Sequence, residues 1–361
     1  MNKFKNFLIL FFLLIFFIEL LSFFIFKLNL LEISHIPKIY MSKDVVPNDE
    51  WWTEENEWGS WHKINSSTLQ KRSCFNVKYS SNGIGARDSS FKSNYKNDVI
   101  LLGDSFAEGY GVNYENTSQK YIENLSNFNV LNFGVSQNFG PVQYWVIYNE
   151  LAKKFQHNSI VIYFLPDNDF GDNDYTNWKE SKRYRPYYKK ISDNYYENFI
   201  PSNSIKKYSS FTTKLKKITK DHLWSSNLFV NLNHKYKTYR SNKKKKNTNY
   251  SAYFDTSAEQ QRAAIFFLDK IINESSANVI LVSIPRPQDF KRLFDGSNLA
   301  EIYWNNYFVN MGKSNNKFKF IDLIKFPPKN LDEIFLKCDG HWSPKGNMWA
   351  AEIISRNLFK D

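Results

Sequence analysis

The stretch Val99-Ile100-Leu101-Leu102-Gly103-Asp104-Ser105 decides the fold of this 361-residue chain. Four consecutive apolar residues that end at turn-forming residues are typical of a strand buried on both faces of a parallel sheet. A serine directly after such a strand lies at the carboxyl end of the sheet, where open α/β sheets hold their active sites. The stretch therefore predicts an α/β fold with Ser105 at its functional edge.

Four further apolar runs have the same character and alternate with amphipathic stretches. The runs are Val130–Phe133, Ile160–Phe164, Val279–Ile284 and Phe318–Ile321. Helical periodicity occupies Pro141–Phe155 and Glu259–Asn273, and Ser343 followed by Pro344 marks the start of a last helix. This alternation predicts a doubly wound, five-stranded parallel sheet with helices on both faces, a flavodoxin-like three-layer sandwich.

The N-terminus is the most apolar part of the chain. Phe7–Phe26 consists mainly of Leu, Ile and Phe, and about 20 such residues at about 1.5 Å each cross a bilayer core of roughly 30 Å. A secretory signal has a shorter apolar region of about 7–15 residues and a small-residue cleavage site, which is missing here. We therefore expect one transmembrane anchor. Lys3 and Lys5 place its N-terminus in the cytoplasm, although Lys27 on the far side weakens that assignment.

Glu19 is a charged residue inside this apolar stretch. Such a carboxyl marks a polar contact with a partner helix, or it is tolerated or neutralised, and both readings stay open. A cytoplasmic N-terminus places the remainder of the chain outside the cytoplasmic membrane, in the periplasm of a bacterium with two membranes. The net charge of +12 suggests an anionic partner. No nucleic-acid partner is expected, because no recognition motif accompanies the lysines.

The rest of the chain divides by composition. A Trp-rich lead-in with few periodic segments occupies 31–96, and its indoles lie near the membrane or wrap the main domain. The α/β domain occupies 97–171 and 257–361. Between them, 172–256 is a basic, polar insertion, partly helical around Ser204–Trp224. Its lysines rest on anionic lipid, grip an acidic polymer or face solvent.

The two cysteines, Cys74 and Cys338, are far apart in the sequence. Their spacing does not resemble a zinc site, so no metal is expected. An exported protein can oxidise such a pair, and a disulfide and two separate buried thiols both remain open. No Gly-rich loop ending in Lys-Ser or Lys-Thr is present, and no cofactor is expected.

A serine nucleophile needs a base, and the chain has six histidines. His341 stands out because it follows Asp339 across Gly340, just before the last helix. Asp339 can turn back to hold Nδ1–H, which leaves Nε2 to accept the Ser105 proton. A surface histidine in a capping loop is the alternative. The other five histidines lack such a motif or lie in the insertion: His35, His62, His157, His222 and His234.

Three blocks now occur in a recognisable order: Gly-Asp-Ser-Phe around Ser105, Pro-Asp-Asn-Asp around Asn168, and Asp339-Gly340-His341. In this order the chain resembles membrane-anchored bacterial members of the SGNH/GDSL hydrolase superfamily. The resemblance covers 97–171 and 256–361, and hardly touches the insertion. It implies that Ser105 is the nucleophile, that His341 is the base and that Asp339 orients it. It also implies an oxyanion hole formed by the Ser105 N–H and the Asn168 amide.

The chain departs from that family in two places. The family has a glycine whose N–H completes the oxyanion hole, and Gln137 stands at the corresponding position in Asn132–Gly140. Glutamine tolerates a positive φ poorly, so Gly134 and Gly140 are alternatives. The spacing Asp-x-His replaces the more widespread Asp-x-x-His, a shorter form that related anchored members also use.

These features predict a serine-dependent ester hydrolase or O-acyltransferase outside the cytoplasmic membrane. Its expected substrate is an acylated, for example acetylated, cell-envelope carbohydrate; this rests on the compartment and not on a sugar-binding motif. The alternative is a non-catalytic, membrane-anchored protein that uses the same fold to bind glycan or to assist envelope assembly.

Overall fold

The computed structural model describes residues 2–28, 30–31, 37–91, 98–181, 183–204, 211–244 and 250–358. The chain forms two compact units. The first comprises 1–51, 67–78 and 208–248, and the second comprises 52–66, 79–207 and 249–361.

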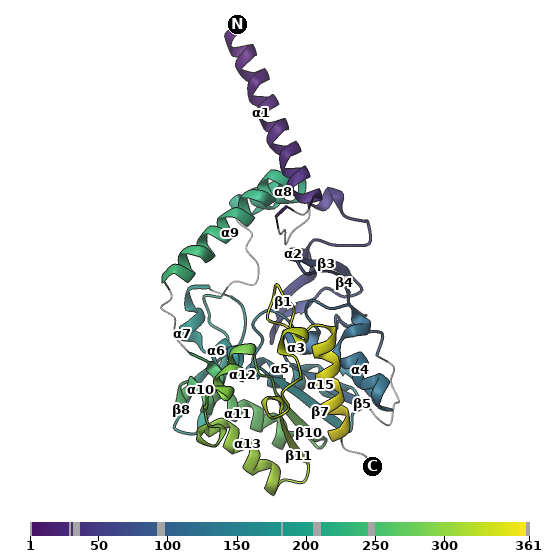
Figure 1. Ribbon diagram of the computed structural model, residues 1–361, viewed down its shortest axis with the longest axis vertical. Coiled ribbons are helices and arrows are strands. Elements are labelled where there is room, and N and C mark those ends of the chain that lie inside the picture. Colours follow the sequence, from purple (N-terminus) through teal and green to yellow (C-terminus); the bar gives the residue numbers. More distant parts are fainter. Residues whose placement is uncertain are drawn as a thin grey trace. The chain divides into compact units, whose positions relative to one another are not determined.

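A five-stranded parallel sheet forms the centre of the second unit (Figure 1). Its strands lie in the order β11-β10-β7-β5-β6, which is the flavodoxin order. The five predicted strands are thereby confirmed. Their bounds are β5 (Asp98–Leu102), β6 (Asn129–Asn132), β7 (Ser159–Phe164), β10 (Asn278–Ser283) and β11 (Phe318–Asp322).

Helices form a layer on each side of this sheet. The helix α4 (Ser118–Leu125) packs against α15 (Pro344–Asn357), while α5 (Pro141–Glu150) packs against α11 (Ala258–Glu274). The three-layer α/β fold is therefore as predicted. The other helices of this unit are α3 (Ser105–Glu108), α6 (Pro166–Asp172), α7 (Tyr175–Trp178), α10 (Ala252–Asp255), α12 (Pro287–Phe294), α13 (Tyr303–Ser314) and α14 (Leu331–Ile334).

The start of α15 follows the capping rules expected from its sequence. The Ser343 hydroxyl accepts a hydrogen bond from the Gly346 N–H at 3.2 Å, and Pro344 occupies the first turn. This cap fixes the residue at which the turn that carries His341 ends and α15 begins.

The lead-in is more regular than expected. It contains two antiparallel hairpins, β1 (Trp52–Asn56) with β2 (Gly59–His62), and β3 (Ser67–Arg72) with β4 (Phe75–Ser80). In β1, β2 and β3 polar and aromatic residues make the two-residue alternation weak, whereas β4 alternates regularly, with Phe75, Val77 and Tyr79 buried. Trp58 and Trp61 are buried in the core of the α/β domain, which agrees with a lead-in that wraps the main domain.

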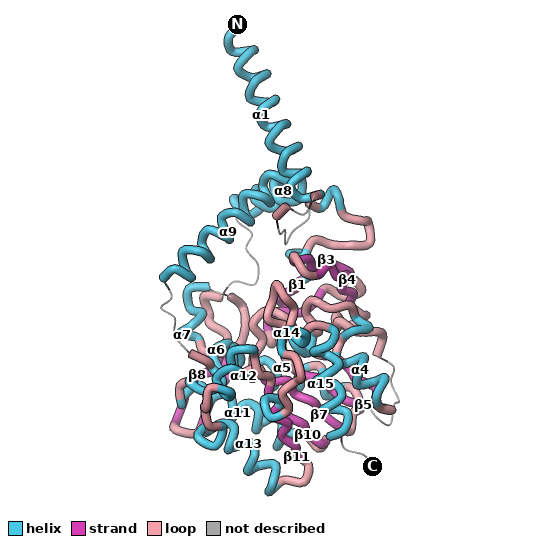
Figure 2. Tube along the Cα trace, viewed as in Figure 1, coloured by secondary structure: helices cyan, strands magenta, loops and turns pink. Residues whose placement is uncertain are grey.

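The insertion also differs from the expectation. It contains a hairpin of β8 (Tyr187–Ser192) and β9 (Tyr195–Phe199) and two helices, α8 (Phe211–His222) and α9 (Trp224–Lys244) (Figure 2). The helix expected around Ser204–Trp224 corresponds to α8, and 205–210 lie outside the described residues. The longer α9 was missed because many Lys, Asn and Tyr residues obscure its apolar spacing.

The first unit begins with α1 (Asn2–Lys27), followed by the short helical turns η1 (Lys38–Tyr40) and α2 (Asn48–Trp51). Within the part of the chain that is described, one helix, Lys3–Lys27, is long and apolar enough to cross a membrane. Both cysteines, Cys74 and Cys338, are disulfide-bonded, so the reading as separate thiols is wrong.

Candidate active site

The connection from β5 to α3 leaves no room for a side chain at Gly103. Its φ is +153°, and an added Cβ would lie 2.8 Å from the Ala107 Cβ and 2.9 Å from the Tyr163 Cβ. Glycine is therefore required at this turn. Because the turn is this tight, the helix begins immediately after the strand and its first residue lies at the edge of the sheet.

Ser105 is the first residue of α3, and Asp104 is its N-cap. The Asp104 carboxylate accepts the Phe106 N–H at 2.9 Å. The first N–H groups of a helix have no partner within that helix, so the Ser105 N–H points out of the helix end. The sequence therefore exposes both the Ser105 hydroxyl and an N–H donor at the same place.

Three residues that were singled out in the sequence meet at this edge. The Ser105 Oγ lies 2.6 Å from the His341 Nε2. The His341 Nδ1 contacts the Asp339 Oδ1, and the His341 backbone N–H donates to the same carboxylate at 3.2 Å. With a proton on Nδ1, His341 presents the Nε2 lone pair to the serine hydroxyl.

Aromatic rings and a cation surround the histidine. The His341 ring centre lies 4.9 Å from that of Phe106 and 4.6 Å from that of Tyr110. A Cβ on Gly340 would lie 2.2 Å from the Arg286 guanidinium. The Arg286 guanidinium therefore packs against the centre of the Asp-x-His turn, a neighbour that the sequence did not indicate.

Buried carboxyl groups lie behind the nucleophile. Burial raises the pKa of Asp104 to about 6 and that of Asp172 to about 6, and it raises the pKa of Asp169 well above its ordinary value. The Asn168 Nδ2 donates to the Asp172 Oδ2 at 2.7 Å, and the Tyr144 hydroxyl donates to Asp169 at 2.9 Å. Asp172 thus orients the Asn168 amide through one of the two N–H donors of that amide.

The loop after β6 has an unusual backbone at Gln137 and Asn138. Gln137 has a φ of +120° and Asn138 a φ of +58°. Gln137 therefore adopts a glycine-like conformation that costs on the order of 1–3 kcal/mol and persists only where the surroundings hold it. Its side chain accepts a hydrogen bond from the Arg183 guanidinium at 2.8 Å, which is one such constraint.

The two alternative glycines have other tasks. The Gly134 N–H donates to the Asn132 Oδ1 at 2.8 Å, and a Cβ on Gly134 would lie 2.4 Å from the Glu108 N. The Gly140 N–H donates to Gln143 at 3.3 Å. Gly134 is needed for close packing and its N–H is occupied, so the alternative that used it as an oxyanion donor is not supported.

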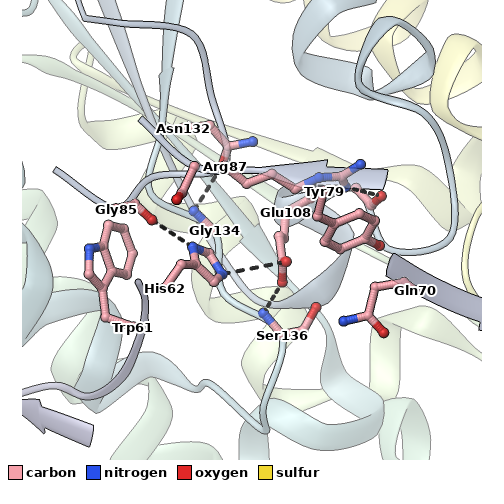
Figure 3. A network of polar contacts seen from close by, with 12 residues as sticks. Trp61, His62, Gln70, Tyr79, Gly85, Arg87, Glu108, Asn132, Gly134 and Ser136 are labelled. Atoms are coloured by element: carbon pink, nitrogen blue, oxygen red, sulfur yellow. Dashed lines mark hydrogen bonds and ion pairs between the residues drawn. The ribbon is translucent and has the colours of Figure 1, made fainter. Parts of the chain in front are cut away.

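A buried ion pair holds the loop that carries Gln137 (Figure 3). The Glu108 Oε2 accepts the N–H of Ser136, and the Glu108 Oε1 lies 3.4 Å from the His62 Nε2. The other ring nitrogen of His62 lies 2.8 Å from the Gly85 carbonyl oxygen. Burial by itself raises the pKa of Glu108, but neighbouring charges, His62 first, lower it overall below its ordinary value.

Arg87 completes this network on the side of α3. Its guanidinium donates to the carbonyl oxygens of Glu108, Gly109 and Val112 at 2.8, 2.6 and 2.7 Å, and it lies 3.4 Å from the centre of the Tyr79 ring. The lead-in thus supplies residues that fix the turn after α3. Neither His62 nor Arg87 was expected to have a role in the site.

Among the described residues, no group of three or more His, Cys, Asp and Glu side chains could hold a metal ion.

Comparison with known proteins gives distant similarities only. No protein-family model and no curated protein matches the chain. Among solved structures, it is similar to a lipolytic protein of the G-D-S-L family from Desulfitobacterium hafniense, with 14% identity, 73% of this chain and 100% of the other covered, and a TM-score of 0.37. It is also similar to a lipase/acylhydrolase from Enterococcus faecalis, with 14% identity, 72% and 94% covered, and a TM-score of 0.38. A third similar structure is a carbohydrate esterase family 2 enzyme with a carbohydrate-binding domain from Corynascus thermopiles, with 12% identity, 75% and 67% covered, and a TM-score of 0.38.

Proposed function

We propose that the chain is a serine-dependent ester hydrolase or O-acyltransferase of the SGNH/GDSL type. One observation carries this proposal: the Ser105 Oγ lies 2.6 Å from the His341 Nε2, while the opposite ring nitrogen contacts Asp339. A nucleophile, a base and a group that orients the base are thus aligned at the carboxyl edge of a parallel sheet.

The proposed reaction is a two-step acyl transfer. His341 takes the Ser105 proton as Oγ attacks the ester carbonyl, and it returns that proton to the departing alcohol. Asp339 keeps the ring in the required tautomer and stabilises the imidazolium. Water or a second hydroxyl then attacks the acyl-enzyme, with His341 again as the base. Water makes the protein an esterase, and a sugar hydroxyl makes it an O-acyltransferase.

The oxyanion of each tetrahedral intermediate needs donors that are already in place. We assign these to the N–H of Ser105, the N–H of Gln137 and the side-chain amide of Asn168. The positive φ of Gln137 supports this assignment, because a glycine-like backbone stands where the family has its glycine. The Glu108 bond to the neighbouring Ser136 N–H is a second support.

We further propose that α1 anchors the chain with its N-terminus in the cytoplasm and the catalytic domain in the periplasm. The apolar Lys3–Lys27 helix supports the anchor, because most of its residues are exposed. Lys3 and Lys5 support the orientation. This compartment favours an acylated cell-envelope carbohydrate as the substrate. The division into lead-in, α/β domain and insertion belongs to the same proposal.

The proposal is tested with the full-length protein in detergent, a short-chain acyl ester and a fluorophosphonate probe. We expect turnover and stoichiometric labelling at Ser105, and the loss of both in Ser105→Ala. Ser314→Ala, which changes an exposed serine at the end of α13, is the matched control and should retain both. An absence of labelling and of turnover on simple esters and acetylated glycans would instead favour the non-catalytic glycan-binding alternative.

A further inference from the structure

Glu19 has partners within its own unit. The carboxylate accepts the N–H of Trp224 on one oxygen and the N–H of Ser225 on the other, the latter at 3.0 Å. These are the first N–H groups of α9, which have no partner within that helix, and a helix N-terminus favours a negative charge. The charge inside the apolar stretch of α1 therefore caps a helix of the insertion.

An aromatic cluster closes over this cap. The Trp224 ring centre lies 5.1 Å from that of Phe26, 5.8 Å from that of Phe23 and 4.9 Å from that of Tyr40. Phe26 and Trp224 are both buried. The cap and the cluster together fasten the start of α9 to the C-terminal turns of α1.

The position of Glu19 sets the depth of this junction. Glu19 lies two turns before the end of α1 at Lys27, which is about 12 Å at about 1.5 Å per residue. If α1 crosses a bilayer, α9 starts well inside the outer end of the span. Interfacial helices bury their apolar face about 5–10 Å into the boundary between headgroups and acyl chains. The depth at which α9 starts is close to this range.

The exposed face of α9 is apolar. Phe229, Leu232, Tyr236 and Tyr239 follow one another at intervals of three, four and three residues, which places them on one side of the helix, and between 47% and 71% of each is exposed. The opposite side carries Asn227, which is buried and donates to the carbonyls of Lys220 and Leu223. The exposed surface of the helix thus carries a stripe of apolar and aromatic side chains.

The shorter helix α8 also has apolar side chains on its exposed surface. Leu215 and Ile218, one turn apart, are each more than half exposed. On its other side Asp221 is buried, and Lys217 forms an ion pair with Glu50 at 2.9 Å. Two neighbouring helices therefore present apolar stripes outward beside the end of an apolar span.

We propose that α8 and α9 form a hairpin that lies in the lipid–water interface of the bilayer that α1 crosses. The apolar stripes face the acyl chains, and exposed lysines such as Lys216, Lys235 and Lys237 bind anionic headgroups. Figures 1 and 2 show α9 leaving the end of α1 at a steep angle rather than alongside it, as an interfacial helix requires. The inference rests on the proposed anchoring by α1 and is independent of the ester chemistry.

A lipid surface accounts for these observations better than a protein partner does. The helix α9 contacts α1, most of whose residues are themselves exposed and apolar, and the capping carboxylate of Glu19 ties the two helices together. Basic residues border the stripes, which matches an anionic leaflet. A second copy of the chain or a membrane partner protein would cover the same stripes, and these possibilities are outcomes of the test below.

The test uses the full-length chain in phosphatidylcholine/phosphatidylglycerol vesicles with nitroxide labels on single introduced cysteines. The native cysteines are disulfide-bonded and leave the labelling selective. Labels at Phe229→Cys and Tyr236→Cys should collide severalfold more with oxygen than with an aqueous nickel chelate. Lys237→Cys, an exposed position of α9 away from the apolar stripe, is the matched control and should show the reverse. Nickel access at 229 and 236 equal to that at 237 would overturn the proposal.

Two further measurements separate the remaining outcomes. A label at Leu14→Cys, in the middle of α1, tests the anchor. If the label at 14 is exposed to lipid and the label at 229 to water, the interfacial hairpin is refuted and the anchor stands. If both labels are exposed to water, the anchor is refuted as well. Spin–spin broadening at 229 that grows with the protein-to-lipid ratio would show a second copy on the stripe.

Glu19→Ala should release α9, with a more mobile and more nickel-accessible label at 229, whereas Glu19→Gln should retain part of the cap.

Discussion

At the scale of single residues, the site depends on groups whose partners are already in place. The carboxylate of Asp339 contacts the His341 ring, and Asp172 holds one N–H of the Asn168 amide at 2.7 Å. Preorganised donors of this kind lose no energy to reorientation as the oxyanion forms. The contribution of each group is therefore measurable by single substitutions.

Asn168→Ala removes the proposed side-chain oxyanion donor. Loss of one such donor typically lowers kcat by about 10²–10³, and we expect a fall of this size with little change in KM. The measurement is steady-state hydrolysis of a short-chain ester, with Asn310→Ala, an exposed asparagine of α13, as the control. An unchanged kcat in Asn168→Ala would remove this residue from the oxyanion hole.

Asp104→Asn tests the buried carboxyl behind the nucleophile. Burial raises its pKa from 3.8 to about 6, so the folded protein keeps the proton in a range where the unfolded chain has lost it. This carboxyl therefore lowers stability as the pH rises from about 4 to about 6, and its cost is fully present above that range. A shift of about two pKa units corresponds to about 3 kcal/mol.

Asparagine is also a good N-cap. We therefore expect Asp104→Asn to raise the free energy of unfolding at pH 8 by on the order of 1–3 kcal/mol and to have little effect at pH 4. Denaturant unfolding at the two pH values measures this. The fully exposed Asp193 supplies the control variant Asp193→Asn. An equal effect of Asp104→Asn at both pH values would show that burial does not set this titration.

At the scale of elements, the loop after β6 needs a partner outside its own strand and helix. Gln137 keeps a positive φ, and Glu108 on α3 holds the neighbouring Ser136 N–H. Glu108 is in turn paired with His62 on the β1–β2 hairpin. The shape of this loop is thus decided by a contact between three segments that are far apart in the sequence.

Glu108→Ala should release this loop. Removing one partner of a buried ion pair costs about 3–5 kcal/mol, and kcat should fall as the Gln137 N–H loses its position. Glu108→Gln retains an oxygen that accepts the Ser136 N–H, so it should recover much of kcat. Kinetics and thermal unfolding of both variants measure the two effects. A Gln variant no more active than the Ala variant would argue against a positioning hydrogen bond.

At the scale of the whole molecule, the proposed topology links an apolar N-terminal helix to an extracytoplasmic catalytic domain. Reporters fused after Asp361 test this arrangement. We expect activity from alkaline phosphatase, which needs the periplasm, and no fluorescence from a reporter that folds only in the cytoplasm. The opposite pattern would refute the orientation.

The sequence determined the sheet of this protein and the three blocks at its edge. Short apolar runs that end at turn-forming residues are typical of strands buried on both faces of a parallel sheet, and the connections of such a sheet bring Ser105, Asn168 and His341 to one end. The short hairpins and α9 were not predicted, because in most of these elements polar and aromatic residues interrupt the periodicity. Strand and helix signals are local, so they can be recognised from neighbouring residues alone.

Only the tertiary structure decided which groups support those blocks. The His62–Glu108 pair, Arg87 at the α3 turn, Arg286 against Gly340 and Glu19 at the start of α9 each join segments distant in the sequence. Likewise, the occupied N–H of Gly134 and the positive φ of Gln137 follow from packing rather than from residue type. Such contacts form because buried polar groups must find partners wherever the fold provides them, and no local pattern records where that is.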